Sequence, residues 1–306
     1  MQRSLILGTL IGAGLLTITV VGQQLPATPG AGGMAAGQQQ AVGAIEKLAD
    51  NVYRIPGAGG NSAVFVMNNG VLLVDTKNPN NGQAVLDQIR SVTDKPVTHI
   101  INTHTHGDHT GSNMFFPANV EIVAQENTKS NMEKMAAFQT PEGKVGLPDR
   151  TFKDKLTLFS GKDAVDLYYY GPAHTGGDAL VVFRNARIMH AGDMFAGKMQ
   201  PILDVNNGGS GVVYGDTIAK AAAAIKNIDK VVTGHSDVMT WQDFVDYGEF
   251  NRLFAAHART SLAAGKSAEQ AMADFKLPEK FAGYNLAGRG GAAGNFTTVY
   301  AELSAK

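Results

Sequence analysis

The chain of 306 residues contains no cysteine, and this absence excludes several kinds of chemistry. Disulfide bonds, a cysteine nucleophile and metal sites with thiolate ligands are all ruled out. Charge is also sparse, because only 17% of the residues are charged and 26 basic against 27 acidic side chains leave a net charge of −1. Nothing in this balance provides a cationic surface for phosphates, so we expect no nucleic-acid partner.

The N-terminus differs in composition from a globular domain. A basic start, Met1-Gln2-Arg3, precedes an apolar stretch of small residues, 4–22. This pattern predicts a secretory signal peptide, 1–22, cleaved near Gly22. The alternative is an uncleaved membrane anchor, because the stretch approaches the roughly 20 residues that span a bilayer. We expect a periplasmic or secreted protein with no stable membrane association after cleavage.

The rest of the chain divides into a linker and one folded domain. Segment 23–43 is rich in Gln, Gly, Ala and Pro without periodicity, which predicts a disordered linker before a domain at 44–306. Short β-branched runs and amphipathic helical patterns alternate there, so we expect a mixed α+β domain. The expected strands are 52–55, 62–67, 71–75, 97–102, 120–124, 155–160, 165–170, 179–183, 186–190 and 230–233. The expected helices are 80–92, 126–138, 214–228, 241–264 and 267–275. Asn80 or Asn81 can cap the first of these helices, and Thr240-Trp241-Gln242-Asp243 resembles a capping box for the helix at 241–264. Long loops are expected at 139–150, over the cleft, and at 195–215; segment 282–294 receives no assignment.

Three histidines and one aspartate fall within six positions at the end of a predicted buried strand: His104, His106, Asp108 and His109. Residues two apart in an extended chain point the same way, so His104 and His106 project to one side. Gly107 frees the backbone to turn and bring Asp108 and His109 toward the same point. Neutral imidazole and carboxylate groups suit zinc, and also iron and manganese.

The spacing favours two metal ions, because adjacent Asp108 and His109 can hardly both reach the ion that His104 and His106 hold. A second ion needs further ligands. Three ligand-type residues, His174, Asp193 and His235, each follow a predicted strand beside Gly or Pro. Strand ends at one edge of a sheet can converge on one cleft.

Taken in order, these seven residues resemble the ligand set of the metallo-β-lactamase superfamily, over roughly residues 47–240. The resemblance implies a four-layer αββα sandwich with the metals at one edge between two sheets. It implies that His104, His106 and His174 hold the first ion and that Asp108, His109 and His235 hold the second. Asp193 would bridge the two ions.

The resemblance also implies a hydrolase that acts on a small-molecule substrate. Two zinc ions, or iron or manganese in their place, would hold a bridging hydroxide that attacks a carbonyl carbon. Asp108 would orient this nucleophile and accept its proton. A lactam or lactone ring is the expected substrate, which makes the protein β-lactamase-like.

Asp193 separates branches of this family. One β-lactamase subclass carries a cysteine there, whereas the aspartate is similar to that of glyoxalase II, lactonases and RNase Z-type nucleases. The lack of basic charge argues against a nuclease, and no cationic cluster for glutathione follows His235. A thioester hydrolase of the glyoxalase II type and an iron-dependent oxidoreductase remain as alternatives, with a metal-binding module without turnover as a third. The sequence does not indicate the oligomeric state.

Overall fold

The structure is a computed structural model that describes residues 41–287 and 293–305. The expected signal peptide, 1–22, and most of the expected linker, 23–43, lie outside these residues. Among the described residues, the backbone of Val42 pairs with Gly57 in an isolated β-bridge, slightly before the expected start of the domain at residue 44. Throughout the described ranges, every helix is too short or too polar to span a bilayer.

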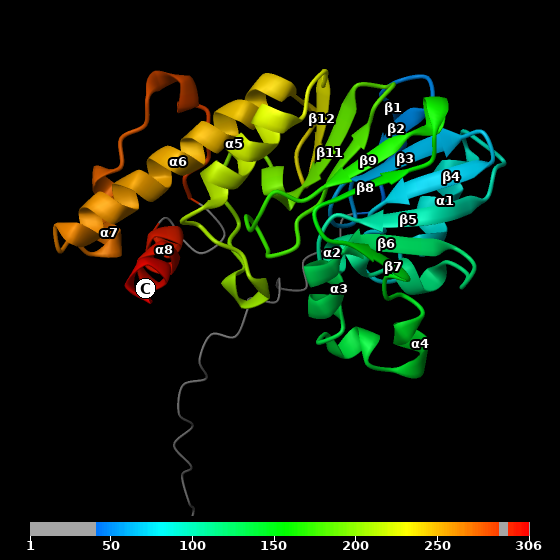
Figure 1. Cartoon of the computed structure of the whole chain (residues 1–306), viewed down its shortest axis with the longest axis horizontal. Helices are drawn as coiled ribbons and strands as arrows, with labels where there is room; N and C mark the ends of the chain where they lie inside the picture. The colour runs from blue at the N-terminus through cyan, green and yellow to red at the C-terminus, as the bar shows by residue number, and fades with distance from the viewer. Residues whose placement is uncertain (1–40, 288–292, 306) are drawn as a thin grey trace, which may run out of the picture. The chain divides into compact units, whose positions relative to one another are not determined.

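Two mixed β-sheets form the centre of the domain (Figure 1). The first sheet has seven strands in chain order: β1 Glu46–Lys47, β2 Val52–Ile55, β3 Ser62–Met67, β4 Gly70–Val74, β5 Val97–Asn102, β6 Glu121–Gln125 and β7 Arg150–Phe152. Strands β1 to β4 pair antiparallel, whereas β4 to β7 pair parallel. The carboxyl ends of β4 to β7 therefore lie at one edge of this sheet.

The second sheet has six strands in the order β13-β12-β11-β10-β9-β8. They are β8 Lys155–Leu158, β9 Val165–Tyr168, β10 Leu180–Phe183, β11 Ile188–Gly192, β12 Lys230–Thr233 and β13 Met239–Thr240. Only β11 and β12 pair parallel among these strands, so their carboxyl ends also lie at a common edge.

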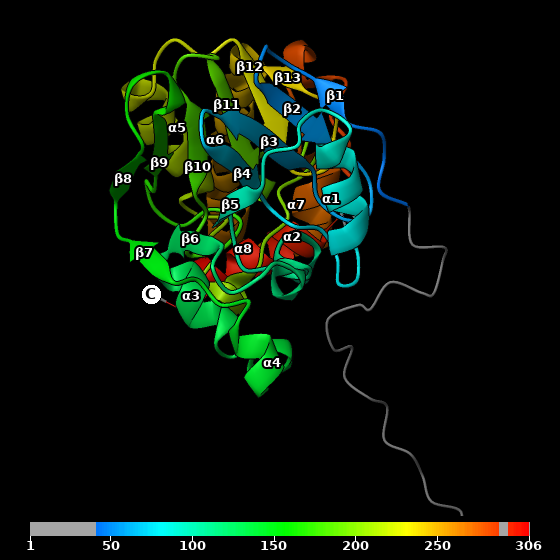
Figure 2. The same ribbon diagram turned by 90° about the vertical axis from the view of Figure 1, so that its right-hand side faces the viewer.

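The two sheets enclose one apolar core, and helices cover their outer faces (Figure 2). Phe65 of β3 and Phe183 of β10 meet across the sheet interface, with ring centroids 5.2 Å apart. Helix α1, Gly82–Arg90, buries Val85 and Ile89 on the first sheet. Helices α5, Tyr214–Ala224, and α6, Trp241–Ala263, cover the second sheet. The predicted four-layer αββα sandwich is confirmed.

Local hydrogen bonds determine where several of the helices begin and end. At α6, Thr240 and Asp243 form the predicted capping box. The predicted side-chain cap of α1 is wrong, because the Asn81 amide donates instead to the carbonyls of Asn78 and Pro79. The single helix expected at 126–138 is also wrong, since it divides into α3, Glu126–Met132, and a 3₁₀ turn. The remaining α-helices are α2 Gly107–Thr110, α4 Pro141–Lys144, α7 Ala268–Asp274 and α8 Gly294–Ser304, and the 3₁₀ turns are η1 Asn113–Phe115, η2 Ala136–Phe138, η3 Gly161–Asp163, η4 Asp193–Phe195, η5 Val205–Asn207 and η6 Glu279–Phe281.

Helix α8 received no sequence prediction. Phe296 on α8 lies against Phe254 of α6, with centroids 4.2 Å apart, and against Phe275, which follows α7. These aromatic contacts attach the C-terminal helices to the outer layer of the second sheet.

Candidate metal centre

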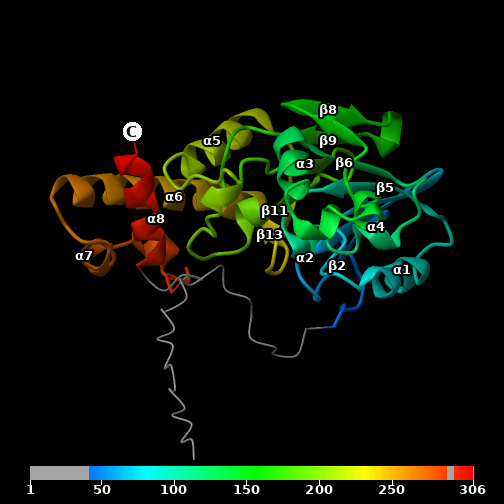
Figure 3. The same cartoon turned by 90° about the horizontal axis from the view of Figure 1, so that it is seen from below.

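The seven predicted ligands lie just after strands at the same edge of the two sheets. Figure 3 shows this edge from below, with α2 next to the end of β11. The first sheet supplies four of them, after β5 and in α2: His104, His106, Asp108 and His109. The second sheet supplies His174 after β9, Asp193 after β11 and His235 after β12.

The structure brings these side chains together in two groups. The first group contains His104, His106, His174 and Asp193, and the second contains Asp108, His109 and His235. Within each group, the atoms that could bind a metal lie within 4.8 Å of one another. Each group draws residues from both sheets.

Asp193 lies between the two groups. Its Oδ1 is 3.3 Å from Nε2 of His109, whereas its Oδ2 is 3.2 Å from Nε2 of His235 and 3.7 Å from Nε2 of His174. Gly234 makes this position available, because a Cβ there would lie 1.9 Å from Oδ1 of Asp193. The carboxylate therefore faces both groups, as a bridging ligand must.

Outer hydrogen bonds fix the tautomers of the first-group histidines. Nδ1 of His174 donates to the carbonyl of Ile202 at 2.6 Å, and Nε2 of His106 donates to Asp204 at 2.7 Å. The unprotonated nitrogens of these two neutral rings then face each other at only 3.0 Å. Two lone pairs at this distance repel, so the arrangement is suited to a cation that both nitrogens bind.

The other two buried ligand-type histidines, His104 and His109, are also oriented through Nδ1. Nδ1 of His109 donates to Asp75 at 2.7 Å, and Nδ1 of His104 lies 3.0 Å from the Thr103 hydroxyl, which donates to Asp75. This leaves Nε2 of His104 buried and, among the described residues, without a hydrogen-bond partner. Such an orphaned nitrogen is costly unless it binds a group from outside the protein. The donor set therefore fits metal ions of the kind that imidazole and carboxylate bind.

The pKa shifts of the buried ligand-type residues in the metal-free protein also indicate that positive charge stabilises this site. Burial and the neighbouring His109 hold the pKa of His104 well below its usual range. Burial alone would lower the pKa of His109 as well, but Asp193 and Asp75 raise it well above that range. Burial would likewise raise the pKa of Asp193, yet His109 and His235 lower it strongly. A proton on His109 thus compensates the buried carboxylates when no metal is bound.

Sequence reasoning missed the residues that orient the ligands: Thr103, Asp75 and Asp204. Asp75 carried a usable signal, because it directly follows β4 as Asp193 follows β11. Asp204 carried none, since it lies in an irregular segment far from His106 in the sequence.

The two expected loops have different relations to the site. Segment 195–215 contacts the ligands directly, through the carbonyl of Ile202 and the side chain of Asp204. Segment 139–150 folds into α4 and the start of β7, and its Gly146 carbonyl accepts a bond from Asn113. Helix α4 lies below the sheets in Figure 1, beyond α3 and on the same side as α2.

Solvent reaches the site from one side. The side chains of His106, Asp108 and His235 are 28%, 21% and 17% exposed, whereas His109 and Asp193 are buried. A hollow of about 410 Å³ borders His235 of the second group; its lining is Arg54, Pro56, Gly57, Gly59, Asn61, His235, Ser236 and Asp237. This hollow is large enough for a small molecule to approach His235.

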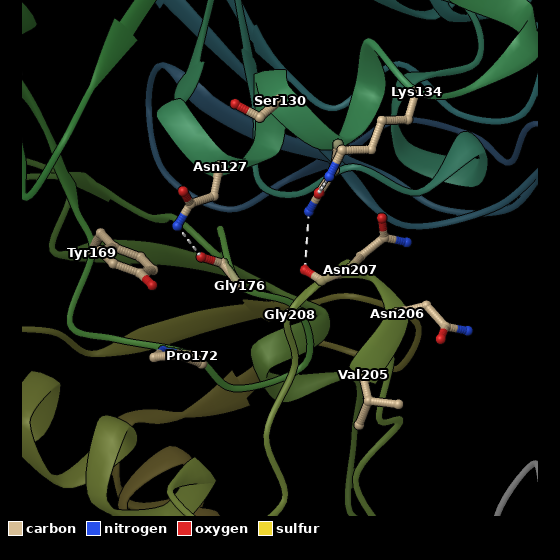
Figure 4. A pocket seen from close by; sticks show the side chains of 11 residues that line it. Asn127, Ser130, Lys134, Tyr169, Pro172, Gly176, Val205, Asn206, Asn207 and Gly208 are labelled. Carbon is tan, nitrogen blue, oxygen red and sulfur yellow. Dashed lines mark hydrogen bonds between the residues drawn. The ribbon is translucent and has the colours of Figure 1, made fainter.

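A second hollow, of about 440 Å³, is lined by residues of α3 and of segment 205–208, among others (Figure 4). Its walls are rich in amide side chains, and Figure 4 shows Asn127 bonded to the carbonyl of Gly176. The amide of Asn207 on its rim donates to Asp204 at 2.6 Å. One wall of this hollow is therefore linked to His106 through Asp204.

Comparisons with known proteins agree with this arrangement. The family model described as the metallo-beta-lactamase superfamily matches residues 55–235. The chain is 28% identical over 154 residues to the 2,4-dinitroanisole O-demethylase subunit alpha of Nocardioides sp. (strain JS1661), which is 49% of this chain and 44% of that protein. It is 24% identical over 205 residues to metallo-beta-lactamase type 2 of Bacteroides fragilis, which is 63% of this chain and 79% of that protein.

A solved structure extends the comparison to the fold. The sec-alkylsulfatase Pisa1 from Pseudomonas sp. matches 85% of this chain and 50% of its own, with a TM-score of 0.70 and 14% identity. The chain spans about half the length or less of this sulfatase and of the demethylase subunit. Because the family match covers more than half of the chain, this protein belongs to the metallo-beta-lactamase superfamily, as the order of its histidines and aspartates predicted.

Proposed function

We propose that this protein is a dinuclear zinc hydrolase that cleaves a carbonyl bond in a small molecule, with a lactam or lactone ring as substrate. Superfamily members are metal-dependent hydrolases of small molecules. The observation that carries the proposal is the position of Asp193, whose carboxylate lies 3.3 and 3.2 Å from His109 and His235 of the second group and 3.7 Å from His174 of the first. A site for one ion would not require such a carboxylate.

The residues that would hold the ions follow from the two groups. His104, His106 and His174 would hold the first ion, and Asp108, His109 and His235 the second, with Asp193 shared between them. Three imidazoles leave a position open for substrate or water, as catalytic zinc sites do. When bound, the ions would polarise the carbonyl oxygen and lower the pKa of a water molecule to roughly 7.

Asp108 is the residue that we assign to proton transfer. Its carboxylate lies on the solvent-accessible side and is 3.4 Å from Nε2 of His235. There it can accept a proton from the attacking water and return it to the departing nitrogen or oxygen. The oxygen of that water forms the new bond to the carbonyl carbon as the bond to the leaving atom breaks.

Metal analysis and a panel of substrates test zinc-dependent hydrolysis against the alternatives. The panel contains a chromogenic cephalosporin, a lactone and a thioester, together with a sulfate ester and an aryl methyl ether, because similar proteins are named sulfatase and O-demethylase. We expect two zinc ions per chain and turnover of the cephalosporin or the lactone. Iron in the purified protein, or turnover of the thioester alone, would favour one of the alternatives.

The matched variants are His104→Ala and His99→Ala. Both remove an imidazole after or within β5, but His99 lies beside Glu121 and outside both groups. His104→Ala should abolish turnover, whereas His99→Ala should retain it. Equal turnover in wild type and His104→Ala would contradict the proposed mechanism.

We also propose export, on the basis of the basic and apolar start of the chain. Fractionation of cells that express the full chain tests this point. Activity in the periplasmic or secreted fraction, with a mature N-terminus near residue 22, is the expected result. A full-length cytoplasmic protein would contradict it.

A further inference from the structure

One short segment, Gly59-Gly60-Asn61, contacts Asp108 and His109 of the second group and the residues on either side of His235. The backbone N–H of Gly60 donates to the carbonyl of Asp108 at 3.0 Å. Gly60 also lies directly against the ring of His109, because a Cβ at this glycine would come within 2.1 Å of Cε1. The segment therefore supports both second-group residues of α2.

Asn61 connects the same segment to the third residue, His235. Its backbone N–H donates to the carbonyl of Gly234 at 2.7 Å. Its side-chain amide donates to the carbonyls of Thr233 and Ser236, each at 2.8 Å. Bonds on both sides of His235 fix the turn that presents this histidine.

A buried lysine holds this segment in place. The side chain of Lys77 is fully buried, and its Nζ donates to the carbonyls of Ile55 and Gly60, the latter at 2.6 Å. Burial lowers the pKa of Lys77 to about 7. The backbone φ of Lys77 is 74°, in the left-handed region, which is rare for residues other than glycine. Such burial and backbone strain are unfavourable, so a compensating role of Lys77 is to be expected.

Two histidines of the first group have supports of their own. His174 is oriented by the carbonyl of Ile202, and His106 by the side chain of Asp204. Within the part of the chain that the structure describes, the ammonium group of Lys77 bonds to Ile55 and Gly60 and not to segment 202–204. The loss of Lys77 should therefore affect the two groups unequally.

We propose that Lys77 is a positioning residue for the second metal site, and that it acts through the segment Gly59-Gly60-Asn61. The inference rests on the proposed dinuclear function. Lys77 itself is a ligand of neither ion. Its ammonium group fixes the carbonyl of Gly60, and the fixed segment then holds Asp108, His109 and His235 at their mutual distances.

The experiment compares Lys77→Met with wild type by zinc titration against a chromophoric chelator. Lys77→Met should weaken binding of the second ion about 10- to 100-fold, the usual effect of losing an outer support of a metal ligand. The first ion should bind within about threefold of wild type. This selectivity separates positioning from a general loss of stability, which would weaken both ions.

Lys95→Met is the matched control. Nζ of Lys95 also donates to a backbone carbonyl, that of Met67 at 2.6 Å, but at the opposite end of β3 from Asn61. This variant should bind both ions as wild type does. Equal weakening of both ions in Lys77→Met, or no weakening, would overturn the inference.

Asn61→Ala provides the second variant if Lys77→Met does not fold. It removes the amide bonds around His235 and should also weaken the second ion selectively; unchanged binding of that ion would overturn the inference. Wild-type protein that binds only one ion would refute the proposed dinuclear function instead. Two ions in wild type with unchanged Lys77→Met would refute only the role of Lys77.

Discussion

Asp75 Oδ2 lies 2.7 Å from Nδ1 of His109, and both side chains are fully buried. The same oxygen accepts a hydrogen bond from the Thr103 hydroxyl, whose oxygen lies 3.0 Å from Nδ1 of His104. One carboxylate at the end of β4 therefore orients a histidine of each group, directly for His109 and through Thr103 for His104.

Asp75→Asn should weaken binding of both ions, because the amide replaces one acceptor oxygen and disturbs both histidine tautomers. We expect a loss of about 10- to 100-fold in affinity for each ion. Calorimetric zinc titration measures the two affinities. Asp229→Asn, which changes an exposed carboxylate bonded to Arg187, is the control and should bind zinc normally. Loss of only the second ion in Asp75→Asn would show that the path through Thr103 is unimportant.

Asp204→Asn should weaken the first ion selectively. The Asp204 side chain bonds to His106 and its backbone N–H donates to the carbonyl of His174, so both of these ligand-type partners belong to the first group. The pKa of Asp204 is lowered, chiefly by the hydrogen bond to His106. Since the Asp204 side chain is one-fifth exposed, water can replace part of the lost bond, and we expect a decrease of about tenfold. The same titration distinguishes the ions, and a selective loss of the second ion would contradict the assignment.

Gly60→Ala should displace His109 and reduce zinc content to one ion or fewer. The new methyl group would lie 2.1 Å from Cε1 of His109, a distance that forces the ring or the backbone to move. Gly107→Ala is the control in the ligand segment itself, because no atom lies within 4 Å of the added Cβ. Zinc content by atomic absorption and thermal unfolding test the pair. Equal zinc content in both variants would show that the Gly60 contact does not position His109.

The metal-free protein should lose stability as the pH falls from about 6.5 toward 4. Burial lowers the pKa of both His174 and His190 to about 4. Below pH 6.5 the unfolded chain binds protons that the folded chain does not, so the free energy of unfolding decreases with falling pH. The loss is on the order of a few kcal/mol per histidine. Urea unfolding with chelator at pH 7, 5.5 and 4.5 measures it.

The variant His190→Gln separates the contribution of His190 to this pH dependence from that of His174. Nε2 of His190 donates to the carbonyl of Asn61 and its Nδ1 accepts from Gly192, so this ring is held neutral without being in either metal group. The variant should show a shallower dependence of stability on pH than wild type, although it is less stable at pH 7. An identical slope would mean that His190 does not contribute.

The sequence was sufficient for features that depend on local pattern. The spacing of His104 and His106 after a β-branched strand, and the capping box at Thr240, are properties of a few adjacent residues. The supports of the site depend on bonds across the fold. Asp75 and His109 are 34 residues apart, and His106 and Asp204 are 98 apart. No periodicity encodes such pairs.

The predicted helix boundaries were wrong where tertiary contacts determine them. Asn81 occupies the expected cap position of α1, but its amide is used by the turn before the helix. Helix α8 follows a glycine-rich segment and is only 11 residues long, so its stability depends on packing of Phe296 against α6 and α7.

Both groups of ligand-type side chains draw members from both sheets, and this has a consequence for the folded protein as a whole. A bound ion would act as a cross-link between the two halves of the sandwich, in place of the disulfides that a chain without cysteine cannot form. By mass action, an ion present at 100 times its dissociation constant adds about 2.7 kcal/mol to the free energy of unfolding. Metal supply in the compartment would then govern how long the protein persists there, in addition to how fast it works.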